Sequence, residues 1–236
     1  MLLCLLTGTL ISAQDLTFPE LRGPYLGQKV PGTTPVLFAP GVVSTGLSER
    51  DITISPDGKE IFYGMTTGRT VTIMYTRCID GLWTEPVIAP FATDDRFFYF
   101  EPCLSPDGNR IFFLTTMPPS GKDPKPGWAY QNIFMADRKA DGTWSEPFDP
   151  GTAINGDQMQ FYPSFTRTQN LYFCRTDPAT RRNTVHRAAF AGGTFTASGK
   201  LPAPVNTDST NPYNVFVAPD ESYLIACIAE IPYSNN

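Results

Sequence analysis

The chain has 236 residues, and its composition favours short strands joined by turns over long helices. Aromatic residues make up 13%, while the 19 Gly and 23 Pro residues break helices and build turns. The net charge is −5, whereas a protein that neutralises nucleic acid phosphates needs a basic surface, so we expect no nucleic acid partner. A single histidine, His186, excludes sites built from several imidazoles. Phosphate loops and EF-hand loops are also absent, and we expect neither a metal nor a cofactor.

The five cysteines do not form a zinc site, because no CxxC pair occurs and their spacings match no zinc ligand set. Cys103 and Cys174 lie in apolar runs, which favours buried free thiols. A disulfide between these two residues is the alternative.

The first 13 residues, MLLCLLTGTLISA, resemble a secretory signal peptide that lacks its basic n-region. The segment is apolar, too short to span a bilayer, and ends in small residues. We expect cleavage near Ala13, a single mature domain over residues 14–236, and a periplasmic or extracellular location. No later apolar run reaches membrane length, so we expect no membrane span. The alternative for residues 1–13 is an apolar N-terminal strand.

A unit of about fifty residues repeats along the chain. The tetrapeptide Ser-Pro-Asp-Gly occupies residues 55–58 and returns 50 residues later at 105–108, each time before an apolar Ile-Phe-aromatic run. Weaker copies begin at Thr166 and Ala218. Proline presets φ at the first turn position, aspartate bonds to nearby backbone, and glycine accepts a positive φ. Each copy therefore predicts a tight turn between two strands.

A second turn motif follows each of the first three copies. It reads Asp-Gly-x-Trp at residues 80–83 and 141–144, and has a degenerate form at 192–195. The aromatic residue of this motif lies 22 or 23 residues before the next first motif. With its flanking strands, each unit has the four strands of one propeller blade. The second unit is longer by residues 117–130, a predicted surface loop rich in Pro, Gly and Lys.

The Ser-Pro-Asp-Gly and Ile-Phe-Phe pattern of residues 105–113 resembles the WD40-like Pro-Asp repeat of TolB-type β-propellers. The leader at residues 23–41 and the sequence YNVFVAPDESYLIA at 213–226 resemble an exported bacterial family with these repeats. The resemblance implies an all-β propeller of four-stranded antiparallel blades. It also implies an exported binding or scaffold protein.

The repeats predict about three and a half blades. Three are complete, the unit that begins at Ala218 supplies an inner half-blade, and residues 35–45 resemble an outer strand that closes the last blade. Such closure removes open sheet edges. Because this count does not complete a ring, we expect a C-terminal truncation of a propeller with about five blades. A four-bladed ring is the alternative.

One equivalent position, four residues before each first motif, is polar in all four units, whereas the residue just before each motif is apolar. The apolar positions predict the core between blades. Propellers keep ligand sites at loop mouths and around the central channel, so we predict that the polar positions and their neighbours form a ligand-binding channel mouth. The predicted ligand-binding residues are Arg50, Asp51, Glu101, Tyr162, Tyr213 and Asn214. The alternative is that strand starts near solvent are simply polar.

These features favour a non-enzymatic binding or scaffold protein whose ligand is a protein, a peptide or a glycan. The alternative is a propeller-fold enzyme that acts on extracellular polysaccharide, with Asp51 and Glu101 as paired carboxylates. We assign no catalytic residue outside that alternative, since the chain has no G-x-S-x-G nucleophile elbow. His186 aligns with the third strand of its blade, where we expect a blade-surface residue.

Overall fold

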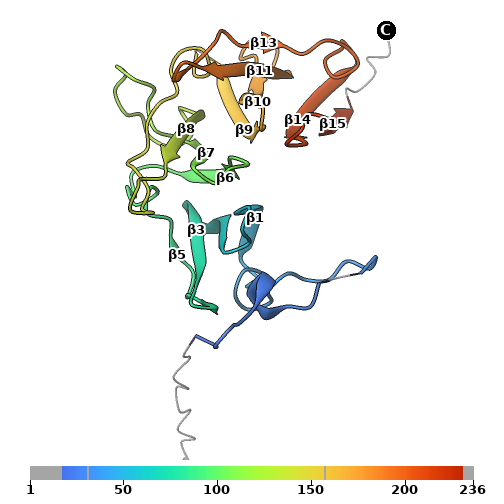
Figure 1. Cartoon of the computed structure of the whole chain (residues 1–236). Coiled ribbons are helices and arrows are strands. Elements are labelled where there is room, and N and C mark those ends of the chain that lie inside the picture. Colours follow the sequence, from blue (N-terminus) through green and yellow to red (C-terminus); the bar gives the residue numbers. More distant parts are fainter. Residues whose placement is uncertain (1–17, 31, 157, 231–236) are drawn as a thin grey trace, which may run out of the picture.

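The computed structural model describes residues 18–30, 32–156 and 158–230 and contains four antiparallel sheets that follow one another along the chain (Figure 1). The first sheet, blade 1, has the order β1-β2-β3-β4, with β5 also paired to β3. A short 3-10 turn, η1 (Pro24–Gly27), precedes it. The strands of blade 1 are β1 (Ser48–Ile54), β2 (Glu60–Thr67), β3 (Thr70–Ile79), β4 (Leu82–Trp83) and β5 (Val87–Ile88).

Blade 3 repeats this five-stranded pattern, whereas the second and fourth sheets have fewer strands. Blade 2 comprises β6 (Tyr99–Leu104), β7 (Arg110–Thr115) and β8 (Asn132–Asp137), and its outer part is reduced to bridges to Trp144 and Phe148. Blade 3 comprises β9 (Met159–Phe165), β10 (Asn170–Thr176), β11 (Asn183–Ala191), β12 (Thr194–Phe195) and β13 (Gly199–Lys200). The half-blade comprises β14 (Thr210–Val217) and β15 (Leu224–Glu230).

The sheets form an arc that is open on one side (Figure 1). The first strand of each sheet is innermost: β1 contacts β6, β6 contacts β9, and β9 contacts β14. In blades 2 and 3, the labelled strands that follow lie progressively further from the centre (Figure 1). This arrangement confirms the predicted all-β propeller fold of antiparallel blades.

The Ser-Pro-Asp-Gly turns form as predicted. In the first copy, the Gly58 N–H donates to the Ser55 carbonyl at 2.8 Å, and Gly58 has φ +70°. The Ser55 hydroxyl donates to Asp57 at 2.6 Å and accepts from the Glu60 N–H at 2.9 Å. These bonds are local, which is why the sequence alone predicts the turn.

The two intact copies differ in their surroundings. A Cβ added to Gly58 would meet no atom within 4 Å, whereas one added to Gly108 would lie 3.2 Å from Pro56 Cδ. Gly108 therefore packs against the turn of the preceding blade. The degenerate third copy places Gln169 at φ +61° without a glycine.

Apolar side chains fill the spaces between adjacent blades. The predicted core residues Leu104, Phe165 and Val217 are buried, each against the preceding blade. Aromatic stacks add to the first of these interfaces, where Phe91 and Phe113 have ring centroids 4.9 Å apart. Such pairs contribute about 0.5–1.5 kcal/mol beyond the area that they bury.

The expected N-terminal closing strand does not form as a strand in the described residues. Within residues 35–45 the only bridge joins Pro40 to Ser44. Proline lacks the N–H that a sheet ladder needs, and the Ala39 carbonyl accepts the N–H groups of Val42 and Val43 to make a turn instead. The segment packs over Tyr63, whose hydroxyl donates to the Val42 carbonyl at 3.3 Å.

Residues 117–130 form no strand or helix, as the loop prediction for this insertion requires. The predicted signal segment, residues 1–13, lies outside the described residues. No helix in the described part of the chain is long and apolar enough to cross a membrane.

Cys103 and Cys174 are free thiols, half-buried and buried respectively.

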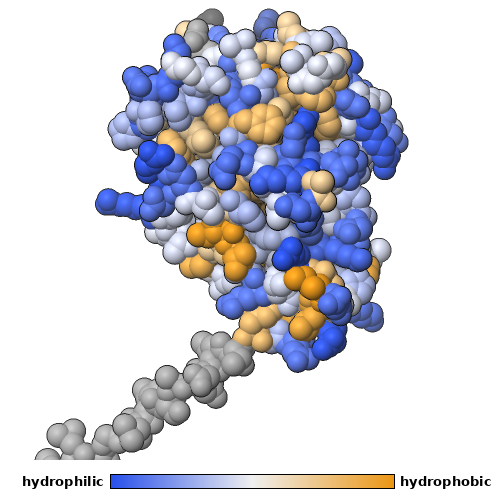
Figure 2. Space-filling model, turned by 60° about the vertical axis from the view of Figure 1, so that its left-hand side comes forward, coloured by the Kyte–Doolittle hydropathy of each residue, from blue (hydrophilic) through white to orange (hydrophobic). Residues whose placement is uncertain are grey.

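Two apolar surfaces lie at the ends of the arc. Ile54 occupies the same repeat position as Leu104, yet 36% of it is exposed, because none of the described sheets packs on it as blade 1 packs on Leu104. At the other end, Phe216 and Ile225 are 45% and 59% exposed on the half-blade. Smaller apolar patches interrupt a largely hydrophilic face in Figure 2. Exposed apolar surfaces and unpaired edges of this kind promote association between molecules.

We therefore expect the 236-residue chain to self-associate when it is expressed alone. Ile54→Thr and Ile225→Thr should each weaken association by roughly tenfold, because burying an isoleucine contributes about 1.5–3 kcal/mol. Sedimentation velocity over a concentration series measures this effect. Val87→Thr, at an exposed position of β5 away from both surfaces, serves as the matched control. A monomer at every concentration would contradict the expectation.

Candidate functional site

All four polar positions predicted for the channel mouth adopt the same unusual backbone conformation. Asp51, Glu101, Tyr162 and Asn214 have φ values of +55°, +56°, +54° and +50°. In each sheet the register between the first two strands shifts at this point, as in a β-bulge. Left-handed φ is uncommon outside glycine, and for a bulky residue such as Tyr162 it is a clear outlier. Bulges redirect a side chain and often lie next to functional sites.

Three of these bulges meet in one hydrogen-bonded cluster, which we call the mouth cluster: Arg50, Asp51, Glu101 and Tyr162. The Arg50 guanidinium pairs through Nε with Asp51 and lies with Nη2 3.4 Å from Glu101 Oε1. The other carboxylate oxygen, Glu101 Oε2, accepts the Tyr162 backbone N–H at 2.7 Å. The cluster thus joins β1, β6 and β9, which belong to three different blades.

Burial sets the charge state of this cluster. Glu101 is only 6% exposed, and burial raises the pKa of its carboxyl to about 8. The Tyr162 N–H and the Arg50 guanidinium oppose this rise, and nearby Asp51 adds to it. Burial also raises the pKa of the Tyr162 hydroxyl to about 12, with further contributions from Asp51 and Glu101. Arg50 is the most exposed member, with 45% of its side chain accessible.

A central cavity of about 490 Å³ opens beside the cluster and is lined by β1, β6, β9 and β14. Asp51, Glu101 and Tyr162 line it, together with apolar residues that follow them in each strand, such as Pro102 and Pro163. The structure therefore brings three predicted site residues together around one space. Arg50 is not among the residues that line this cavity, but its guanidinium pairs with Asp51 and Glu101, which are.

Tyr213 and Asn214 stand apart from this cluster. Neither lines the central cavity, although Val215 and Phe216, which follow them in β14, do. Tyr213 pairs with Cys227 across the half-blade, and both predicted residues are half-buried. Asn214 shares the left-handed conformation of the other three positions, but among the described residues no side-chain hydrogen bond or ion pair joins Tyr213 or Asn214 to the mouth cluster.

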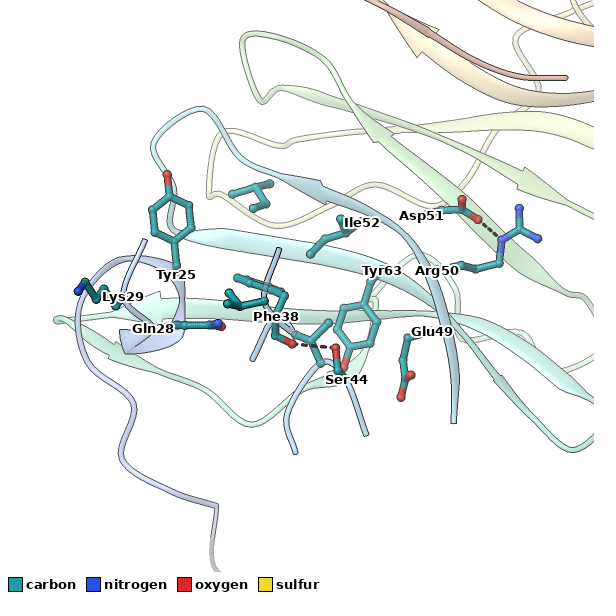
Figure 3. Close-up of a pocket in the computed structure, with 13 residues that line it drawn as sticks. Tyr25, Gln28, Lys29, Phe38, Ser44, Glu49, Arg50, Asp51, Ile52 and Tyr63 are labelled. Carbon is teal, nitrogen blue, oxygen red and sulfur yellow. Dashed lines mark hydrogen bonds and ion pairs between the residues drawn. The ribbon is translucent and has the colours of Figure 1, made fainter. Parts of the chain in front are cut away.

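A second pocket, of about 440 Å³, lies between the N-terminal leader and β1 (Figure 3). Its walls are largely apolar and include Tyr25, Phe38 and Ile52. A 2.8 Å bond from the Ser44 hydroxyl to the Phe38 carbonyl closes a turn within the N-terminal segment. Arg50 and Asp51 lie at one end of it (Figure 3). Sequence reasoning missed this pocket, because nothing local in the leader indicates which blade face it covers.

His186 lies on β11, as predicted, and does not line the central cavity. It is half-buried beside Thr184, with Nε2 3.0 Å from the Thr184 hydroxyl. Burial lowers its pKa to about 4, with Arg175 and Lys200 adding to the effect, so the ring is neutral at pH 7. Among the described residues, no group of three or more His, Cys, Asp or Glu side chains is arranged to hold a metal ion.

Comparison with solved structures bears on the fold. The chain superposes on TolB from Acinetobacter baumannii with a TM-score of 0.53 and 15% identity, covering 83% of this chain and 41% of TolB. The fold is that of a TolB-like β-propeller. At this identity the likeness concerns the fold alone. The chain spans less than half the length of the solved structures that it matches.

Two other matches have TM-scores below 0.5. Hydrazine synthase from Kuenenia stuttgartiensis matches at 0.47 with 18% identity, over 74% of this chain and 48% of that one. Prolyl oligopeptidase B from Galerina marginata matches at 0.49 with 11% identity, over 75% and 22%. No family model and no curated protein matches the sequence.

The raised pKa of Glu101 predicts a pH-dependent stability. Between pH 4.5, its usual pKa, and about 8, the folded protein binds a proton at Glu101 that the unfolded chain releases. The Glu101 contribution to the free energy of unfolding therefore falls as pH rises through this window. Glu101→Gln removes that contribution, so the variant should gain stability relative to the wild type between pH 5 and pH 8.

Urea unfolding at a series of pH values measures this difference. Glu85→Gln, at an exposed position of the outer part of blade 1, is the control and should follow the wild-type profile. Parallel profiles for the wild type and Glu101→Gln would show that the Glu101 carboxyl is not held neutral by burial.

Proposed function

We propose that the protein is an exported, non-enzymatic binding or scaffold propeller whose ligand binds at the channel mouth. The observation that carries this proposal is the convergence of Asp51, Glu101 and Tyr162 from three blades on one cavity. Each of these residues has a left-handed backbone conformation, and such strained residues cluster at functional sites. A packing role alone would be met by apolar residues in an ordinary strand conformation.

The ligand in this proposal is a protein, a peptide or a glycan, and Arg50, Asp51, Glu101 and Tyr162 contact it. Tyr213 and Asn214 form an outer part of the same mouth in this proposal, since Asn214 has the same left-handed conformation as the other three positions. Export to the periplasm or the cell exterior is proposed from the apolar segment at residues 1–13 and is consistent with a TolB-like fold. The proposed family is the exported WD40-like Pro-Asp repeat propellers.

An array of peptides and glycans tests the binding site. Any ligand captured by the wild type should bind at least tenfold more weakly to Glu101→Ala and to Tyr162→Ala, because each loses a group that lines the cavity. Glu85→Ala, at an exposed position outside the mouth, is the matched control. Unchanged binding of every captured ligand by both mouth variants would overturn the proposed site.

A polysaccharide-acting enzyme is the second candidate function, and one observation favours it. Burial raises the pKa of the Glu101 carboxyl while the Asp51 carboxylate pairs with the same guanidinium, that of Arg50. Glycoside hydrolysis uses a pair of carboxyl groups, one of which has a raised pKa and serves as the acid. A hydrolysis screen on polysaccharides from pH 4 to pH 9 tests it. If no polysaccharide is hydrolysed, or if Asp51→Asn leaves the hydrolysis unchanged, this candidate is eliminated.

A further inference from the structure

The insertion at residues 117–130 carries an exposed tryptophan to the edge of the mouth cluster. Trp128 packs on two phenylalanines of blade 2, with ring centroids 5.0 Å from Phe98 and 5.1 Å from Phe100. Even so, 44% of Trp128 remains exposed. The other two tryptophans, Trp83 and Trp144, are buried in blades. An indole held in place on one side and open on the other is a ready stacking platform.

This platform is continuous with the mouth cluster. Phe100 directly precedes the Glu101 bulge, and the Arg50 guanidinium lies over its ring at 5.9 Å from the centroid. Aromatic and polar groups therefore adjoin one another in the order Trp128, Phe100, Arg50, Glu101. A ligand made of two or more linked units can therefore contact the Trp128 indole and the mouth cluster at the same time.

The insertion is held in shape by its own bonds, so the platform is pre-organised. The Tyr130 hydroxyl donates to the Asp123 carbonyl at 3.2 Å, and the Lys125 ammonium lies 5.0 Å from the centre of the Tyr130 ring. The Ser120 N–H donates to Asp149 at 2.8 Å, which ties the loop to the outer part of blade 2. Pre-organisation lowers the entropy lost when a ligand binds.

The charges of the mouth cluster select the kind of ligand. Arg50 already pairs with Asp51 and lies near Glu101, so a cationic ligand would have to compete with an internal cation. An anionic ligand would meet the carboxylate of Asp51. The burial that raises the pKa of Glu101 further reduces the negative charge. The cluster therefore offers hydrogen-bonding groups with little net charge, and the Arg50 guanidinium is the most exposed of them.

We propose that Trp128 and the mouth cluster together bind a neutral glycan. A pyranose ring has an apolar C–H face that packs on an indole, and a rim of hydroxyls that exchange hydrogen bonds with guanidinium and carboxylate groups. In this proposal Trp128 stacks on one sugar ring, and Arg50 and Asp51 bind the hydroxyls of the next. The inference rests on the proposed function, since it names the ligand class of the same site.

Tryptophan fluorescence gives a direct test. The full chain is titrated with neutral glucan, mannan and galactan oligosaccharides while quenching by acrylamide is measured. Trp128 is the accessible fluorophore of the described residues, so a bound glycan should protect it from the quencher. Trp128→Ala should weaken glycan binding, measured by calorimetry, at least tenfold, whereas Trp128→Phe should retain most of it. Tyr223→Ala, an exposed aromatic on the half-blade, is the control.

A matched set of lysine-rich, acidic and proline-rich peptides separates the two proposals. Glycan binding that depends on both Trp128 and Glu101 supports both. Peptide binding that depends on Glu101, without glycan binding, overturns the glycan assignment and leaves the binding function standing. Glycan binding that ignores Trp128 overturns the platform. If no member of either set binds at the mouth, both proposals fail.

Discussion

One left-handed residue in each innermost strand places the polar groups of the site. In a strand with regular alternation, successive side chains point to the two faces of a blade, so Asp51, Glu101 and Tyr162 would point toward the interfaces between blades. The bulge inserts an extra residue and changes that direction locally, while the following residues resume their packing. Core and site therefore coexist within a few residues of one strand. The Tyr162 N–H that the bulge exposes is the same group that binds Glu101.

Arginines link adjacent blades around the turns between the first two strands of each sheet. Arg138 on blade 2 pairs with Glu60 on blade 1 and lies over Trp144 at 4.4 Å from the ring centroid. Arg110 binds Asp137 at 2.8 Å and lies over Phe190 of blade 3. The aromatic core holds the blades by non-directional burial, and these pairs add direction. A polar cluster within the arc can persist only because the blades are held in fixed relation on both sides of it.

Sequence reasoning predicts the strands well because the turns that separate them are set by local chemistry. The Asp80-Gly81 turn, with φ +51° and +81°, needs only its own residues. The bulges are different, since Tyr162 has no local preference for its conformation and adopts it only through pairing with the next strand. The position of Trp128 is hidden for a related reason: composition identifies a loop but not the surface on which it folds. Tyr213 and Asn214 show the limit of repeat logic, because equal positions do not guarantee equal neighbours.

The contact between Gly108 and Pro56 makes two identical tetrapeptides unequal. The turn at residues 55–58 has open space beside its glycine, while the turn at 105–108 fits against a proline of the blade before it. Replacing Gly58 by a larger residue would strain only the backbone of its own turn. The same replacement at Gly108 would also push against Pro56 of the neighbouring blade. The substitutions that each copy of the motif tolerates therefore depend on which blade packs beside it as well as on the motif itself. In the described arc, the turn of blade 1 therefore tolerates a side chain at its glycine position more readily than the turn of blade 2, which packs against it.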